Sequence, residues 1–188
     1  MSSHTMTAFD ADLSAIRSRV IDMGCRVREA VGNGIIALGE RNLDLAQTLI
    51  GLDAKIDSMQ REIETKAIET IARRQPLAVD LRELVSAFHI VNDLERIGDL
   101  AKSICKRTLV TDSAPPSKLL RGIRRVSIPV LNQLGLVLDS YAERDAAKAL
   151  SVWSSDRSRL VRRECASIGC YLMSATTDVQ GGTDLCTG

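Results

Sequence analysis

The sequence predicts an all-α fold, and three observations support this prediction. Aromatic residues make up only 3% of the 188 residues. Runs of β-branched residues that alternate with polar ones over the length of a strand are missing from the sequence. Apolar residues instead recur every three to four positions over long segments, which is the spacing of one face of an α-helix.

The first helix is expected from about Ala8 to Glu40. Its apolar positions recur at intervals of three and four, at Leu13, Ile16, Val20, Met23, Val27, Val31 and Leu38. Asn42 is expected to cap a second helix, which continues to about Gln75. Pro76 ends that helix, because the residue before a proline is disfavoured in the α region.

A third helix is expected to begin at Asp80 and to end at Lys106 and Arg107. Its acidic start and basic end complement the helix dipole. Helices of this length joined by such short turns fold back antiparallel. Residues 1–109 are therefore predicted to form one up-down-up bundle of three helices.

An internal repeat predicts a second bundle after a linker at residues 110–117. A shift of 103 residues places Glu40–Asn42 on Glu143–Asp145 and Asp53 on Asp156. A first unit of three helices predicts a second unit of three. The match fails after Asp156, so residues 118–157 are expected to form a helical hairpin of an incomplete second bundle. Residues 158–188 are expected to be an atypical, loosely ordered tail.

The hairpin predicted at 118–157 carries an apolar stripe that its missing third helix would have covered. We expect this stripe to lack an intramolecular partner. Its members are Val126, Val130, Leu134, Val137, Leu138, Leu150, Val152 and Trp153. Self-association, most simply as a homodimer, is the expected remedy.

Two pairs of carboxylates, each spaced four residues apart, are the candidate site. Asp53 and Asp57 lie in the second helix, and Glu95 and Asp99 lie in the third. Residues four apart share a helix face at roughly 6 Å, so each pair can offer oxygen atoms to one hard cation. Both pairs border the predicted apolar stripes. From the pattern alone, a solvated helix flank with Lys55 and Arg96 as ion-pair partners is the favoured interpretation.

Three segments together resemble the PhoU family of phosphate-uptake regulators. They are Leu52–Asp57 with Arg61–Glu64, then Ala72–Glu83, then Asp93–Ile104, which contains Glu95-Arg96-Ile97-Gly98-Asp99. The resemblance covers roughly residues 5–157. It implies two three-helix bundles side by side, each with a Glu/Asp-x-x-x-Asp motif that binds multinuclear metal clusters, iron in particular. On this chain the motif falls on Asp53, Asp57, Glu95 and Asp99.

The resemblance implies a cytoplasmic negative regulator of phosphate uptake and of the phosphate-starvation response. Its implied partners are the ATPase of a phosphate ABC transporter and a sensor histidine kinase. Oxygen-only ligands leave manganese and magnesium as alternatives to iron. The sequence departs from the family after Asp156, as a changed reading frame or a truncated gene near codon 157 would produce.

An enzyme is the alternative from another functional class, as a di-iron carboxylate helical bundle. Such enzymes carry Glu-x-x-His pairs, and this sequence has none. An inactive truncated product is a third possibility. Of the two histidines, His4 is expected in a disordered N-terminus and His89 partly buried. Cys25 and Cys105 are expected to be small core residues.

Bulk charge and hydropathy exclude two classes of partner. The formal net charge is +1, which favours neither nucleic acid nor an anionic membrane surface. The sequence shows no secretory leader pattern and no run of about 18 apolar residues, so we expect a cytoplasmic protein without direct membrane insertion.

Overall fold

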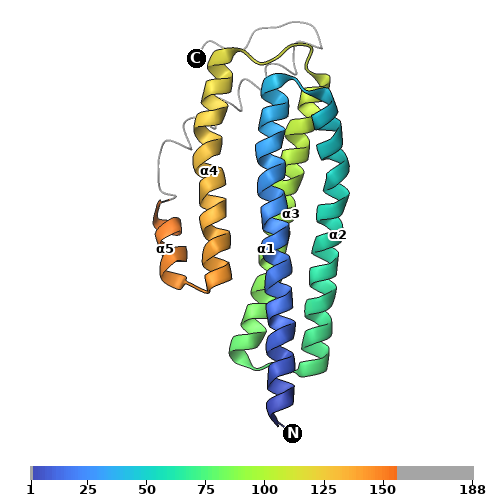
Figure 1. Ribbon diagram of the computed structural model, residues 1–188, viewed down its shortest axis with the longest axis vertical. Coiled ribbons are helices and arrows are strands. Elements are labelled where there is room, and N and C mark those ends of the chain that lie inside the picture. The colour runs from blue at the N-terminus through green and yellow to red at the C-terminus, as the bar shows by residue number, and fades with distance from the viewer. Residues whose placement is uncertain (1, 156–188) are drawn as a thin grey trace, which may run out of the picture.

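The computed structural model describes residues 2–155, and within this range every regular element is a helix (Figure 1). The helices are α1 (Ser2–Glu40), α2 (Leu43–Arg74), α3 (Ala78–Val110), α4 (Ser117–Glu143) and α5 (Ala146–Ser155). The predicted all-α fold is confirmed. The predicted tail at 158–188 lies outside the described residues. No described helix has both the length and the hydropathy needed to cross a membrane.

Helices α1, α2 and α3 pack against one another as an up-down-up bundle (Figure 1). Its core takes one stripe from each helix, including Met23 of α1, Ile63 of α2 and Leu84 of α3, all almost fully buried. The helix boundaries differ from the expected ones by a few residues at most ends. The larger difference is at the N-terminus, where the helical backbone begins at Ser2 and includes His4, which was expected to be disordered.

The third helix begins at Ala78 and ends at Val110 rather than spanning residues 80–107. Pro76 does end the preceding helix, as predicted. Gln75 takes a left-handed conformation with φ 47° and donates its backbone N–H to the carbonyl of Ile71. This arrangement satisfies a carbonyl that would otherwise lack a partner at the helix end.

The turns that join α1 to α2 and α4 to α5 are built in the same way, which confirms the internal repeat at this point. Asn42 accepts a hydrogen bond from the backbone N–H of Leu45 at 3.0 Å, and Asp145 accepts one from that of Lys148 at 2.9 Å. The preceding residues are both left-handed, with φ 52° at Arg41 and φ 56° at Arg144. The shift of 103 residues therefore relates structure as well as sequence.

Helix α4 packs along α1, at positions where α1 carries glycine. The space where a Gly24 side chain would lie is filled by Leu138 of α4. Further along, Leu131 lies 3.8 Å from the Cβ position of Gly32, and Leu120 lies 3.5 Å from that of Gly39. These three glycines lie on one side of α1 and open a groove for the larger side chains of α4.

The α1–α4 contact is symmetric under the same 103-residue shift. Leu131 of α4 packs on Gly32 of α1, and the residues that the shift relates to this pair also meet. They are Gly135 of α4 and Arg28 of α1. The Arg28 guanidinium lies 3.1 Å from the position that a Cβ atom on Gly135 would take. Figure 1 shows α4 running antiparallel to α1. The two hairpins therefore meet through a local pseudo-two-fold contact.

This contact corrects part of the expectation for the hairpin at 118–157. Leu138 is 5% exposed, and Leu134 packs against the core of the first bundle. Val152 of α5 is also buried. The prediction that the whole stripe lacks a partner was wrong, because the α1 glycines admit one side of α4. Val130, Val137 and Leu150 do remain exposed.

Two single-residue predictions differ from the structure. Cys105 is buried as expected, but Cys25 is exposed. His89 is exposed rather than partly buried. For Cys25, the face of α1 that packs is narrower than the apolar face expected from the sequence.

Candidate functional site

The candidate site lies on the seam between α2 and α3, where the two helices approach closely at Gly98. A Cβ atom at Gly98 would lie 3.3 Å from Cδ1 of Ile56. Gly98 immediately precedes Asp99, and Ile56 immediately precedes Asp57. The small residue therefore brings the two helices together at the level of both acid pairs.

Lys102 of α3 reaches across this seam to α2. Its ammonium donates a hydrogen bond to Asp53 Oδ2 and lies 3.7 Å from Asp99 Oδ1. The Asp53 carboxylate is buried, with its side chain 7% exposed. Asp53 Oδ2 lies nearer to the ammonium than Asp99 Oδ1 does. The distance between these two carboxylate oxygens is therefore less than twice 3.7 Å. One acid from each pair thus contacts the same cation.

Glu95 belongs to the same electrostatic cluster. Burial raises the pKa of its carboxyl, and the negative charge of Asp99 and a side-chain hydrogen bond with it raise the pKa further. Asp57 and Asp53 act in the same direction. The hydrogen bond with Asp53 raises the pKa of Lys102, and the charges of Asp99 and Asp57 add to this. The three aspartates therefore all contribute to the electrostatic environment of Glu95.

The four carboxylates do not form a finished ligand shell. Within residues 2–155 no group of three or more His, Cys, Asp or Glu side chains is arranged to hold a metal ion. The Lys102 ammonium lies between Asp53 and Asp99 instead. The donor chemistry fits a hard cation, because every candidate ligand atom is a carboxylate oxygen. A metal ion would have to displace the ammonium and draw the carboxylates inward.

Lys102 is the residue that sequence reasoning missed. The expected flank partners, Lys55 and Arg96, form no ion pair with the described residues. Lys102 follows Asp99 by three positions, so it lies on the same face of α3. That spacing was visible in the sequence. The reach of Lys102 to Asp53 was not, because it depends on the register between α2 and α3.

Known proteins with similar sequences share one family. The PhoU domain matches residues 20–108. A Rhizobium meliloti protein named "Phosphate-specific transport system accessory protein PhoU homolog" is 43% identical over 155 residues, which are 82% of this chain and 65% of that protein. A Caulobacter vibrioides protein of the same name is 41% identical over 157 residues, 83% of this chain and 68% of that protein. The chain therefore spans about two thirds of the length of these relatives.

Solved structures agree with the sequence relatives. The crystal structure of PhoU from Pseudomonas aeruginosa superimposes with a TM-score of 0.78 at 31% sequence identity, covering 91% of this chain and 83% of that one. The phosphate transport system regulatory protein PhoU from Streptococcus pneumoniae gives a TM-score of 0.78 at 23% identity, covering 90% of this chain and 79% of that one. This second likeness concerns the fold alone.

Proposed function

The chain belongs to the PhoU family, and on this premise we propose that it is an accessory protein of a phosphate-specific transport system. In this role it restrains phosphate uptake and the phosphate-starvation response. Relatives of this chain carry the name of such an accessory protein, which supports the proposal. It acts by binding rather than by catalysis, in the cytoplasm.

The single observation that supports metal binding in this role is the cluster on the α2–α3 seam. Asp53 and Asp99 come from different helices and already contact one positive charge. Carboxylates held this close, with Glu95 beside them, repel one another unless a cation neutralises them. Lys102 supplies one such charge. A multivalent metal ion would supply more in the same place.

The ligands of the proposed metal are Asp53, Asp57, Glu95 and Asp99. The proposed metal is iron in a multinuclear cluster, and manganese and magnesium are the alternatives that oxygen ligands allow. When bound, such an ion supplies positive charge that ties α2 to α3. The chain's own part is to hold the carboxylates on one seam, through the close approach at Gly98.

The proposed partners are the ATPase of the phosphate ABC transporter and a sensor histidine kinase, with the protein acting between them. We propose that the protein itself is a homodimer. Several exposed apolar residues on the α4–α5 hairpin support self-association, because a second copy of the chain could cover them.

A phosphate-responsive reporter in living cells tests this function. Deleting the gene should switch the reporter on in phosphate-replete cells, and an intact copy should switch it off again. A reporter that stays off in the deletion strain contradicts the proposal.

A further inference from the structure

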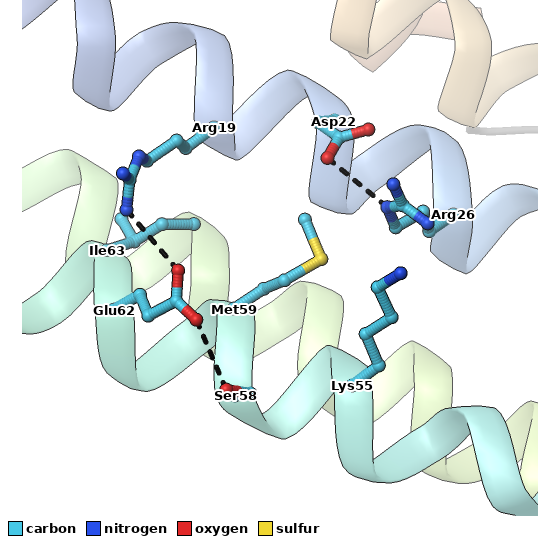
Figure 2. A pocket seen from close by; sticks show the side chains of 8 residues that line it. All are labelled: Arg19, Asp22, Arg26, Lys55, Ser58, Met59, Glu62 and Ile63. Carbon is cyan, nitrogen blue, oxygen red and sulfur yellow. Dashed lines mark hydrogen bonds and ion pairs between the residues drawn. The ribbon is translucent and has the colours of Figure 1, made fainter.

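A second polar site lies on the other side of α2, in a hollow between α1 and α2 (Figure 2). Its volume is about 410 Å³. The polar side chains at its wall are Arg19, Asp22 and Arg26 from α1, and Lys55, Ser58 and Glu62 from α2. Met59 lies between them (Figure 2). This hollow shares no residue with the carboxylate cluster on the α2–α3 seam.

Both acids in this hollow already have partners. Asp22 accepts a hydrogen bond from Arg26 Nε at 3.2 Å. Glu62 accepts one from Arg19 at 3.4 Å and one from the Ser58 hydroxyl at 3.2 Å (Figure 2). The negative charges that the hollow contributes are therefore engaged within the protein.

Lys55 has no carboxylate partner among the described residues. Figure 2 shows its ammonium directed across the hollow toward the guanidinium of Arg26. Arg26 uses Nε to bind Asp22, which leaves its two terminal nitrogens as donors. The Lys55 ammonium and the Arg26 guanidinium thus face the same hollow, and both have N–H donors available for a ligand. Like charges so placed repel unless an anion lies between them.

We propose that this hollow binds a small oxyanion, held between Lys55 and Arg26. A guanidinium and an ammonium are the usual donors to tetrahedral oxyanions. The hollow favours an oxyanion that carries an O–H group, because the Asp22 and Glu62 carboxylates that line it can each accept one more hydrogen bond besides those they already accept. Hydrogen phosphate has such an O–H group and sulfate has none, so the hollow favours phosphate.

The choice of inorganic phosphate as the physiological occupant rests on the proposed function, whereas the binding geometry does not. A regulator of phosphate uptake that binds phosphate would respond to its concentration directly. The side chains concerned are exposed, so solvent screens the charges and the affinity is weak, on the order of millimolar. Weak binding suits an ion that is abundant in cells.

Phosphorus NMR or calorimetric titration of the full chain with inorganic phosphate tests the proposal. The protein is first dialysed against a chelator, so that no metal ion at the carboxylate cluster can hold phosphate. Chloride keeps the ionic strength constant. We expect saturable binding, which Lys55→Gln weakens about tenfold. Lys106→Gln, the same change at an exposed position of α3, should leave the affinity unchanged.

Two further arms define the ligand. Sulfate should bind more weakly than phosphate, and phosphoserine, which presents a phosphate monoester, should bind no better than inorganic phosphate. Absent or unsaturable binding overturns the proposal, and so does an equal loss in both lysine variants. Sulfate binding as tight as that of phosphate overturns the preference for a protonated ion. Because these tests use purified protein, their failure would leave the reporter experiment on phosphate signalling unaffected.

Discussion

Lys102 holds α3 to α2 by donating to Asp53, whose carboxylate is the most deeply buried acid of the candidate site. The ion pair between Lys102 and Asp53 has two consequences. It neutralises a carboxylate that burial would otherwise penalise. It also occupies the place that a metal ion bound by Asp53 and Asp99 would take. The ammonium and the metal are therefore expected to compete.

Replacing Lys102 with Met should reveal that competition. Without the ammonium, the clustered carboxylates repel one another, so the metal-free protein should melt at a lower temperature than the wild type. Added manganese or iron should then raise the melting temperature of Lys102→Met by more than that of the wild type. Lys106→Met, at an exposed position one helical turn away, is the control. Equal metal responses in both variants would contradict the competition.

Replacing both Glu95 and Asp99 with Ala should remove bound metal. The two acids supply the α3 side of the proposed ligand set, and the α2 pair alone offers too few oxygen atoms for a multinuclear cluster. Metal content per chain, measured by mass spectrometry of the purified protein, checks this. The matched control is Asp139→Ala with Glu143→Ala, an exposed pair of the same spacing on α4. Unchanged metal content in the double variant of Glu95 and Asp99 would contradict the assignment of the metal site.

A methyl group at Gly24 should displace α4 from α1. Gly24→Ala places a Cβ atom in the space of the buried Leu138 side chain, so we expect destabilisation by about 1–3 kcal/mol. Gly51→Ala is the control, because a Cβ atom there meets no atom within 4 Å. Alanine at this exposed interior position of α2 should stabilise the protein by roughly 0.5–1 kcal/mol. Thermal unfolding compares the two. Hydrogen exchange should show faster opening of α4 in Gly24→Ala alone.

Acid should destabilise the end of the bundle where Asp12 of α1 pairs with Lys66 and Arg74 of α2. Hydrogen bonds from Lys66 and Arg74 lower the pKa of this carboxyl, although partial burial opposes the effect. A group whose pKa is lower in the folded state stabilises the fold above its unfolded pKa, and this stabilisation disappears as the pH falls through the lowered folded value. Asp12→Asn should therefore cost about 1 kcal/mol at neutral pH and nothing in strong acid. Denaturant titrations at several pH values measure the difference, and a cost independent of pH would exclude this mechanism.

The exposed apolar residues of the α4–α5 hairpin should drive self-association. Val137 and Leu150 are 46% and 63% exposed. Sedimentation of the wild type at micromolar concentration should show a dimer, and Leu150→Glu should shift it toward the monomer. A wild type that remains monomeric would mean that another segment of the chain covers this face.

Local chemistry made most of the helical architecture predictable from the sequence. The Asn42 cap, the stop at Pro76 and the repeat of the α1–α2 turn in the α4–α5 turn each depend on a few neighbouring residues. The two acid pairs could also be placed on neighbouring helices, because the spacing of four fixes a face. Their long-range interactions could not be predicted. The contact of Lys102 with Asp53 depends on how far α3 slides along α2.

The packing of α4 was hidden for a similar reason. A glycine in a helix looks like a weak point when read alone, and nothing in the α1 pattern shows that Leu138 fills the space beside Gly24. Apolar periodicity identified the stripe on α4 correctly. It gave no means of deciding which part of that stripe a neighbouring helix would cover.

The pseudo-two-fold contact of α1 with α4 places both halves of a self-complementary interface in one chain. Two separate copies of a hairpin would form such an interface only above a threshold concentration. Here the short connection from Thr111 to Pro116 keeps the two surfaces at an effective concentration on the order of millimolar. The contact is therefore independent of how much protein the cell makes. A protein built in this way keeps the same internal architecture whether it is scarce or abundant.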